Sequence, residues 1–464
     1  MSAVVQPTPP VTAGLPLAVG DPARVLVFDG AGRVSLGEFM DQARGLAARL
    51  PDARYVAHLS ADRYRFLLGF CAAAMRGQVA LLPPSGAPRT LAEVLQVHAA
   101  GGAYRLGGEQ GLAVDGPEAV PGTASAVGHP VPTVRGGDLA AIGYTSGSTG
   151  RPQAHAKTWA AFATGTAQNL VALADLWGGQ PPQVVATVPP QHMYGMEMSV
   201  LLPLLGGAAV HAGRPLLPAD VALALEQACG PRLLVTTPVH LRALLRSGVA
   251  LPPLAGIVSA TAPMPPELAA EAEDRYGGEV RELFGSTETC VFARRRTARD
   301  DLWTPLPGVR VAPQPDRTLV HAPHLPEPVA LADLMEVAAD GRFRVCGRQA
   351  DLLEIAGKRA SLGDLTRRLL AVPGVEDGVV VQLQPEQEGG VGRIAALAVA
   401  PGLAPADIVA ALRATLDPVF LPRKVRLLPQ LPRNATGKLC REVLLEALAG
   451  PCSSAGGEGT GDAA

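Results

Sequence analysis

Residues 139–153 read LAAIGYTSGSTGRPQ, an apolar run followed directly by a turn of glycine and hydroxyl residues. The run LAAIG is typical of a buried strand. Glycine and hydroxyl residues in a tight loop can direct N–H and O–H groups at phosphate oxygens, because small side chains let those oxygens approach. A Walker A pattern cannot be read through the stretch. The spacing favours a phosphate loop, and a Ser/Gly linker turn is the alternative interpretation.

Outward from this loop, short apolar segments alternate with helix-like ones. This alternation predicts parallel strands joined by crossover helices, and therefore an α/β fold with a doubly wound core of roughly 300 residues. The expected strands lie at residues 23–30, 53–60, 78–84, 181–190, 207–213, 231–238 and 254–263. The expected helices lie at residues 36–50, 63–77, 90–100, 219–230 and 238–248.

The chain changes character near residue 346, where a short hairpin, a turn, a helix and a strand predict a compact α+β unit. We place a large N-terminal domain at residues 1–346, a hinge at 347–350 and a small C-terminal domain at 351–450. The Gly/Ser-rich residues 451–464 are expected to form a disordered tail, because they contain no hydrophobic anchor.

Composition excludes several classes of protein. The chain has 464 residues, of which 48% are hydrophobic. It is therefore too long and too apolar to be a small disulfide-stapled scaffold. The 40 basic and 42 acidic residues give a net charge of −2, so no overall field would attract nucleic acid or an anionic membrane. The six cysteines show no zinc-like spacing, and no apolar run is long enough to span a membrane. We expect a cytoplasmic protein that recognises its partners at defined sites.

Five segments, in order along the chain, resemble the acyl-adenylate-forming enzymes, the superfamily of acyl-CoA synthetases, peptide-synthetase adenylation domains and beetle luciferases. YTSGSTGRP resembles the phosphate loop, LPPLAGIVSATAPMP the adenine-binding turn and ELFGSTE the YGxTE signature. PVALADLMEVAADGRFRVCGRQAD is similar to the GDL…GRxxD stretch, and LPRNATGKL to the C-terminal PRxxxGK loop. The resemblance spans about residues 140 to 440.

The resemblance implies a site for ATP, distributed over these segments. Phe284 would stack on the adenine, Thr287 would hydrogen-bond the α-phosphate, and Asp333 would accept the ribose hydroxyls, with Arg348 beside it. Ordinary core packing of Phe284 and helix capping by Asp333 are the alternatives. The remaining implied nucleotide contacts are Thr145, Ser146, Gly147, Ser148, Thr149 and Gly150 around the β- and γ-phosphates, and Thr261, Ala262 and Pro263 along the adenine.

The resemblance also assigns the catalytic groups. Glu288 would hold Mg²⁺, a hard cation that takes carboxylate and phosphate oxygens. Lys438 would bridge the attacking carboxylate and the α-phosphate, where two anions must meet. Only four of the 40 basic residues are lysines, and one of them lies in this loop. The small domain is implied to be mobile and to turn about Ala350, where the family more often carries Asp or Lys.

The phosphate loop departs from the family at its end. The family ordinarily has GxPK, whereas this chain has Gln153 in the lysine position, followed by His155 and Lys157. Two interpretations of Lys157 stay open: it replaces the missing positive charge, or it is a solvated lysine.

The acid-binding segment reads PPQHMYGM at residues 189–196. Peptide-synthetase domains place an Asp there for the substrate ammonium; none is present here, which disfavours an amino-acid substrate, although Glu197 complicates this argument. His192 resembles the histidine of aryl and coumarate ligases, and a structural histidine is the alternative. The expected acid-binding residues are His192, Met193, Tyr194, Gly195, Ala260 and Gly285.

The local sequences at residues 146–159 and 191–204 resemble those of the short ligases that load aryl or acyl groups onto acyl carrier proteins in aryl-polyene and xanthomonadin pigment clusters. This implies activation of an aromatic acid, a 3- or 4-hydroxybenzoate, and its transfer to a phosphopantetheine thiol. The alternatives are coenzyme A as acceptor or a medium-chain fatty acid as donor. A nucleotide-binding regulator without turnover is disfavoured, because a sensor would not need the Lys438 loop.

Overall fold

A computed structural model describes most of the chain. The chain divides into two compact units. The first holds nearly all residues up to 344, and the second holds the residues from 345 onward together with 315–317 and 332–335. The described residues are 14–83, 87–108, 111–114, 130–146, 152–348, 352–355, 358–383, 393–433, 439 and 441–449.

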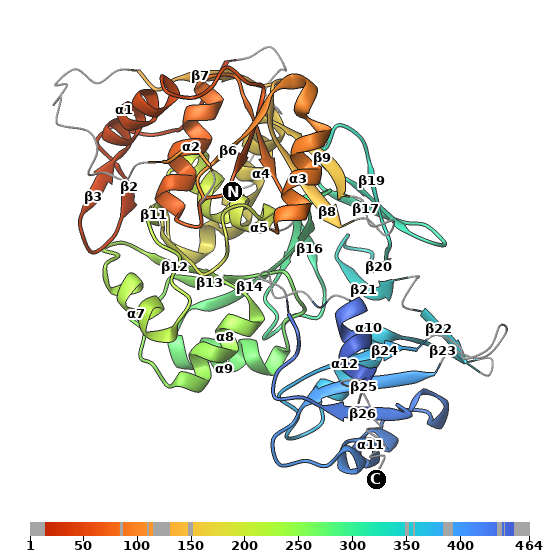
Figure 1. Cartoon of the computed structure of the whole chain (residues 1–464). Coiled ribbons are helices and arrows are strands. Elements are labelled where there is room, and N and C mark those ends of the chain that lie inside the picture. The colour runs from red at the N-terminus through yellow and green to blue at the C-terminus, as the bar shows by residue number, and fades with distance from the viewer. Residues whose placement is uncertain are drawn as a thin grey trace, which may run out of the picture. The chain divides into compact units, whose positions relative to one another are not determined.

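A five-stranded sheet in the first unit contains the strand of the predicted phosphate loop (Figure 1). Its order is β6-β4-β5-β8-β9, and all neighbouring strands run parallel except β8 and β9. Parallel neighbours need crossover connections, which α2 (Arg63–Met75) and α3 (Pro88–Val97) provide. The strands are β4 (Tyr55–His58), β5 (Val79–Leu82), β6 (Ala103–Leu106), β8 (Leu139–Ser146) and β9 (Pro152–Thr158).

A nine-stranded sheet forms the second layer of this unit, in the order β16-β15-β14-β13-β12-β10-β11-β2-β3. Its centre from β14 to β2 is parallel, and β15, β16 and β3 are added antiparallel at the edges. The bounds are β2 (Val25–Phe28), β3 (Arg33–Ser35), β10 (Gln183–Ala186), β11 (Ala209–His211), β12 (Arg232–Thr236), β13 (Gly256–Ser259), β14 (Glu279–Ser286), β15 (Cys290–Arg295) and β16 (Thr304–Pro305).

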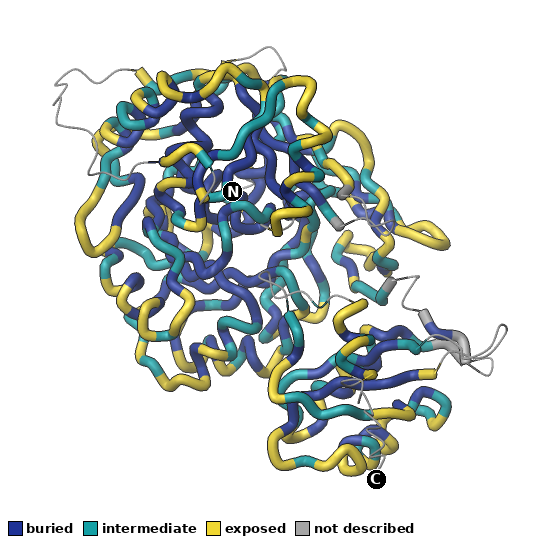
Figure 2. The backbone as a smooth tube through the Cα atoms, in the orientation of Figure 1, coloured by how far each residue is buried: buried dark blue, intermediate teal, exposed yellow. Residues whose placement is uncertain are grey.

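Helices cover both sheets (Figure 1), and the backbone inside this unit is largely buried (Figure 2). The largest apolar cluster among the described residues contains residues of both sheets. α4 contributes Trp159 and Phe162 to this cluster, and α2 contributes Phe66 and Phe70. A second cluster packs α7, α8 and α9 against the nine-stranded sheet. The remaining helices of this unit are α1 (Leu36–Ala47), α4 (Trp159–Leu173), α5 (Met193–Met196), a π-helix at Glu197–Leu201, α6 (Leu202–Gly206), α7 (Pro218–Glu226), α8 (Pro238–Ser247) and α9 (Pro266–Tyr276).

Small antiparallel pairings complete the first unit. β1 (Gly14–Pro16) pairs with β7 (Thr133–Arg135). A three-stranded sheet contains β17 (Arg310–Pro313), β18 (Thr318–His321) and β19 (Val329–Leu331). The chain then passes between the two units along β20 (Asp333–Val337) and β21 (Phe343–Arg348).

The second unit is a small α+β fold with its own core. β24 and β25 pair antiparallel, and β26 adds parallel to β25. Leu365, Leu369 and Ile408 pack on one side of this sheet. The elements are β22 (Leu352–Ile355), β23 (Lys358–Ser361), α10 (Leu362–Leu370), β24 (Asp377–Gln382), β25 (Ile394–Val399), α11 (Pro405–Arg413), β26 (Lys424–Leu427) and α12 (Arg441–Ala449).

The structure confirms the predicted α/β class, with a large first part and a smaller α+β part. The strands and helices expected from apolar alternation are present, with bounds that differ by a few residues. None of the helices among the described residues is long and apolar enough to cross a membrane. The proposed tail, 451–464, lies outside the described residues.

Candidate functional site

The predicted phosphate loop begins at the carboxyl end of β8 and leads into β9. Residues 147–151 lie outside the described residues, as do the side chains of Ser146 and Pro152, so Gly147, Ser148, Thr149 and Gly150 stay predictions. The base of the loop is ordered by a side-chain contact, because Thr145 Oγ1 lies 3.1 Å from Nε2 of His155. Burial lowers the pKa of His155, which keeps this ring largely neutral at pH 7.

The predicted metal-binding turn connects β14 to β15. Ser286 and Thr289 close the turn on each other, because the N–H of Ser286 donates to Thr289 Oγ1 and the N–H of Thr289 donates to Ser286 Oγ. Cys290 takes a φ of +57°, a conformation that non-glycine residues rarely adopt. Thr287 and Glu288 lie between these anchors and stay partly exposed, so both side chains are accessible to a ligand.

Motif segments that are far apart in the sequence meet at the end of β8. The Oε1 of Glu288 lies 3.6 Å from the Nε2 of His155. A Cβ placed on Gly143 would lie 2.6 Å from Thr287 Cγ2 and 3.2 Å from Met193 Cε, so the missing side chain of Gly143 lets both residues approach β8. The structure therefore brings together the strand of the predicted phosphate loop, the Thr287–Glu288 turn and the start of the predicted acid-binding segment.

Lys157 does not have the solvated position that one interpretation of the sequence allowed. Its residue is 5% exposed, and its Nζ donates a 2.6 Å hydrogen bond to the main-chain oxygen of Glu288. An ammonium group that leaves water requires such a partner. Sequence reasoning did not foresee this contact, because the two residues are 131 positions apart.

Glu197 is a buried carboxyl group whose oxygens already have partners. The N–H of Val291 donates to its Oε1 and Oε2 at 3.0 and 3.1 Å, and Asn169 Nδ2 donates at 3.3 Å. Burial raises the pKa of Glu197 to about 7, against the effect of these hydrogen bonds. This carboxyl group is therefore part of the interior that supports β15.

The predicted adenine turn follows β13 directly. Ala260 is buried, and Thr261 and Ala262 are half-buried, whereas Pro263 is exposed. Thr261 has a φ of +79°, and among the described residues its buried Oγ1 has no hydrogen-bond partner. A strained turn with an unpartnered hydroxyl group fits a bound polar ligand that supplies the missing partner.

Phe284 lies on the last part of β14 and is half-buried. Its ring centroid is 4.9 Å from that of Phe292 and 5.1 Å from that of Trp303. Gly285 follows at a break in the β14–β15 register, where a Cβ would lie 2.3 Å from the Cys290 oxygen. The aromatic cluster supports Phe284 while leaving part of it exposed, which is compatible with stacking on a base.

The predicted acid-binding segment forms the short helix α5 at the carboxyl end of β10. His192 precedes the helix and is half-buried, and Met193 is buried. The hydroxyl group of Tyr194 donates to the main-chain oxygens of Val258, at 2.8 Å, and of Thr236, so it holds the helix to the sheet. Gly195 packs against the main chain, where a Cβ would lie 1.9 Å from the Pro189 oxygen.

Four predicted residues lie at or beyond the passage to the second unit. Asp333 begins β20 and is half-buried, and Arg348 ends β21 with its side chain outside the described part. Ala350 and Lys438 both lie outside the described residues. The base of the Lys438 loop is described: Arg433 pairs with Leu439 in a β-bridge, and its guanidinium holds both carboxylate oxygens of Asp377 at 2.8 and 3.0 Å.

The donor set at Glu288 fits a magnesium ion that is bound mainly through phosphate. Among the described residues, no three His, Cys, Asp or Glu side chains gather to enclose a metal. Mg²⁺ in nucleotide sites takes one or two carboxylates and completes its shell with phosphate oxygens and water. Glu288 would supply the carboxylate, next to the strand that leads into the predicted phosphate loop.

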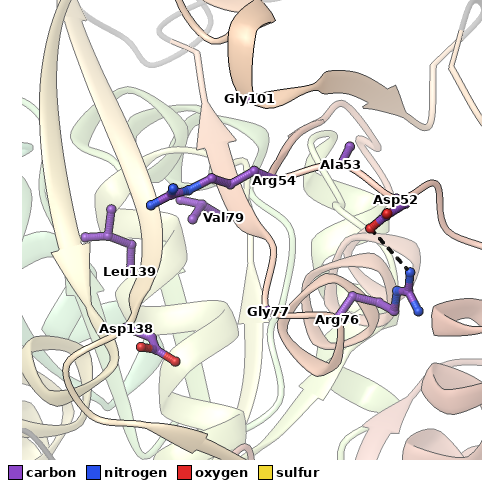
Figure 3. Close-up of a pocket in the computed structure, with 9 residues that line it drawn as sticks. All are labelled: Asp52, Ala53, Arg54, Arg76, Gly77, Val79, Gly101, Asp138 and Leu139. Atoms are coloured by element: carbon purple, nitrogen blue, oxygen red, sulfur yellow. Dashed lines mark ion pairs between the residues drawn. The ribbon is translucent and has the colours of Figure 1, made fainter.

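A hollow of about 550 Å³ lies at the opposite edge of the five-stranded sheet (Figure 3). Its lining includes Asp52 and Arg54 before β4, Arg76 after α2, and Asp138 before β8, which places it at the amino ends of the parallel strands. Ligands of open α/β sheets bind at the carboxyl ends of the strands. None of the predicted site residues that the structure describes lines this hollow.

Comparison with known proteins identifies the family. Residues 18–316 match the model of the AMP-binding enzyme, and residues 367–438 match that of the AMP-binding enzyme C-terminal domain. A 4-coumarate–CoA ligase from Halorhodospira halophila is 31% identical over 315 residues, 64% of this chain and 73% of that protein. A 3-hydroxybenzoate–CoA/4-hydroxybenzoate–CoA ligase from Thauera aromatica is 28% identical over 351 residues, 65% of each chain.

A solved structure shows the same fold. It is the o-succinylbenzoate coenzyme A synthetase from Bacillus subtilis in complex with ATP and magnesium ion, with a TM-score of 0.75 and 19% identity. The alignment covers 91% of this chain and 96% of that one. Because the first family model alone spans more than half of the sequence, the chain is a member of the AMP-binding enzyme family.

Proposed function

We propose that the protein activates an aromatic carboxylic acid, a 3- or 4-hydroxybenzoate, with ATP and transfers the acyl group to the phosphopantetheine thiol of an acyl carrier protein. The first step would form the acyl adenylate and release pyrophosphate. The observation that carries the proposal is the meeting of Thr145, His155 and Glu288 at the end of β8. In this arrangement Glu288 would supply a carboxylate for Mg²⁺ beside the loop that would hold the ATP phosphates.

The proposed nucleotide site begins at the end of β8. Phe284 would stack on the adenine, and the unpartnered hydroxyl group of Thr261 supports a polar ligand at that turn. Thr287 would bind the α-phosphate, and Asp333 and Arg348 the ribose. The loop residues Thr145, Ser146, Gly147, Ser148, Thr149 and Gly150 would surround the β- and γ-phosphates, with Ala262 and Pro263 along the adenine.

Lys438 would neutralise the charge that grows as the carboxylate attacks the α-phosphate. We place the mobile C-terminal domain at residues 351–450 and the hinge at 347–350, around Ala350. A turn of this domain would withdraw Lys438 after the first step and admit the thiol. The Arg433–Asp377 pair at the base of the Lys438 loop supports this role, because it anchors one end of the loop on β24.

An aromatic acid is favoured over an amino acid by the interior beside α5. Neither residues 189–196 nor Glu197 supplies a free carboxylate for a substrate ammonium, since the oxygens of Glu197 accept from Val291 and Asn169. The similarity to hydroxybenzoate and coumarate ligases points to the same substrate class. His192 would meet the phenol or the carboxylate, with Met193, Tyr194, Gly195, Ala260 and Gly285 along the ring.

The acceptor rests on the local resemblance to ligases of pigment biosynthesis, and coenzyme A is the alternative. The named acceptor of both relatives is coenzyme A, so the alternative has direct support. A regulator that binds ATP without turnover is disfavoured, because it would not need the Lys438 loop. We further propose that the protein acts in the cytoplasm, where ATP and carrier proteins are available.

Carboxylate-dependent exchange of labelled pyrophosphate into ATP tests the first step. The assay would compare benzoate, 3- and 4-hydroxybenzoate, cinnamates, fatty acids and amino acids, with Mg²⁺ present. We expect the fastest exchange with a hydroxybenzoate, followed by thioester formation on a carrier protein. Exchange with fatty acids alone would overturn the aromatic assignment, and thioester formation on coenzyme A alone would overturn the carrier assignment.

A further inference from the structure

Buried side chains form hydrogen bonds with the backbone of the turn that carries Glu288, residues 286–291. The main-chain oxygen of Glu288 accepts from Lys157 Nζ at 2.6 Å, and that of Thr289 accepts from His324 Nε2 at 2.7 Å. The N–H of Val291 donates to Glu197. All of these anchoring side chains belong to residues that are at most 5% exposed.

Lys157 differs from the other anchors because it lies on the strand that leaves the phosphate loop. Side chains two residues apart on a strand point to the same face, so His155 and Lys157 both face the Glu288 turn. His155 is near the Glu288 carboxylate at 3.6 Å, and Lys157 holds the carbonyl of the same residue. β9 therefore contacts both the side chain and the main chain of Glu288.

The surroundings show how a buried cation is accommodated there. The positive charge of Lys157 favours the ionised form of the Glu197 carboxyl group and so lowers the pKa of Glu197. Burial is the larger effect, and it raises the pKa of Glu197 to about 7. The Cys290 thiol is also hydrogen-bonded to Lys157, and burial raises its pKa to about 12. Burial lowers the pKa of His324 to about 4, so this ring adds no second cation at pH 7.

We propose that Lys157 is a positioning residue that fixes the Glu288 carboxylate for the metal–ATP complex by bonding the Glu288 carbonyl. The inference rests on the proposed function of Glu288 as the ligand of Mg²⁺. It assigns a role to the lysine that the sequence places after a phosphate loop lacking its usual lysine. In this role Lys157 acts through its hydrogen bond to the backbone of the turn and does not contact the phosphates.

The test is the affinity of the full chain for ATP, measured by calorimetry with Mg²⁺ and again with the metal chelated. In Lys157→Met, an unbranched side chain fills the same space without the donor. We expect the gain in ATP affinity that Mg²⁺ provides to fall about tenfold or more, the scale of one lost hydrogen bond to a charged group. The affinity for metal-free ATP should stay within twofold.

Lys424→Met is the matched control. Lys424 Nζ also donates to a main-chain oxygen at 2.6 Å, that of Leu448, but the bond lies within the second unit. The control removes the same charge and the same kind of bond, and its ATP affinities should equal those of the wild type. Equal losses in both variants would overturn the proposal.

A second variant separates positioning from the neutralisation of a buried charge. Lys157→Met leaves Glu197 without its cation, and Glu197→Gln added to it removes that charge. If Lys157 only neutralises Glu197, the double variant regains the effect of Mg²⁺, which would overturn the proposal. We expect the double variant to recover its thermal unfolding midpoint but not the effect of Mg²⁺.

The outcome is distinguishable from a failure of the proposed reaction. The wild type could bind ATP more tightly with Mg²⁺ and yet show no pyrophosphate exchange with any acid. That result would contradict acid activation, but the calorimetry would still test whether Lys157 positions Glu288. Wild-type exchange together with an unchanged effect of Mg²⁺ in Lys157→Met contradicts only the role of Lys157.

Discussion

The two edges of the five-stranded sheet use charged residues in opposite ways. At the amino edge, Arg54, Arg76 and Asp138 are exposed around an open hollow (Figure 3), and the Arg76–Asp52 pair is 3.9 Å apart with Asp52 fully exposed. At the carboxyl edge, Lys157 is 5% exposed and has a fixed partner in the Glu288 carbonyl.

This difference indicates which of the two edges can hold a reacting group in place. An exposed ion pair contributes about 0–1 kcal/mol and leaves its side chains free to move. A buried charge must keep its hydrogen-bond partner, because losing that partner is costly. The hollow therefore marks the less organised edge, whereas buried polar groups fix the backbone at the edge where we propose the site.

The largest effect is expected for Glu288→Gln at the carboxyl edge. An amide keeps the size of the side chain but removes the negative charge that would bind Mg²⁺. We expect pyrophosphate exchange to fall roughly 10²- to 10³-fold, the scale of one lost transition-state interaction. The exposed Glu226, changed to Gln, is the control and should retain wild-type exchange.

Gly143→Ala tests the close approach of the motif segments. The added Cβ would lie 2.6 Å from Thr287 Cγ2, so Thr287 must move. We expect exchange to fall about ten- to a hundredfold from this misplacement, with a native circular dichroism spectrum. Gly45→Ala is the control, since a Cβ there meets nothing within 4 Å. Wild-type exchange in Gly143→Ala would show that the position of Thr287 is not critical.

Glu197→Gln tests the buried interior of the carboxyl edge through pH. Burial raises the folded-state pKa of Glu197 from 4.5 to about 7, so the folded protein binds this proton more tightly than the unfolded chain. Rising pH therefore costs the wild type stability between about 4.5 and 7, by up to about 3 kcal/mol, and nothing further above that range. Urea unfolding midpoints should be measured at pH 5 and pH 8. We expect the midpoint of the variant, relative to that of the wild type, to be higher at pH 8 than at pH 5. Parallel changes in both proteins would contradict the burial of this charge.

The smallest effect is expected at the amino edge. Arg76→Ala removes a half-exposed partner of an exposed carboxylate, so exchange should stay within twofold and stability within about 1 kcal/mol. Exchange and urea unfolding measure both quantities on one preparation. A large loss of exchange would mean that the hollow takes part in the reaction and would break the distinction between the edges.

Much of the fold could be predicted because apolar alternation is a local signal. β5, β12 and β13 are buried along their whole length or nearly so, and their Val, Ile and Leu runs predict strands directly. α4 was not among the expected helices, because its buried residues leave little amphipathic pattern. The π-helix at Glu197–Leu201 lacks a local signal as well.

Site residues could be proposed from the sequence only where residue type is tied to one chemistry, and these assignments stay predictions. Glycines and hydroxyl residues after a strand indicate a phosphate loop, and a Thr-Glu pair after FGS resembles a known signature. The burial of Lys157 could not be predicted, because its partner is a backbone oxygen 131 residues away and has no residue type. Alternation with Ala154 and Ala156 was the one hint that its side chain faces a specific side of β9.

The most direct test of the account is a single-turnover reaction without thiol. The full chain would be mixed with α-labelled ATP, Mg²⁺ and 4-hydroxybenzoate, quenched in acid and separated by chromatography. We predict one equivalent of aryl adenylate bound to the protein, matched by one of pyrophosphate, and its loss when a carrier thiol is added. Formation of ADP, or no aryl adenylate from any aromatic acid by protein that binds ATP, would contradict the account.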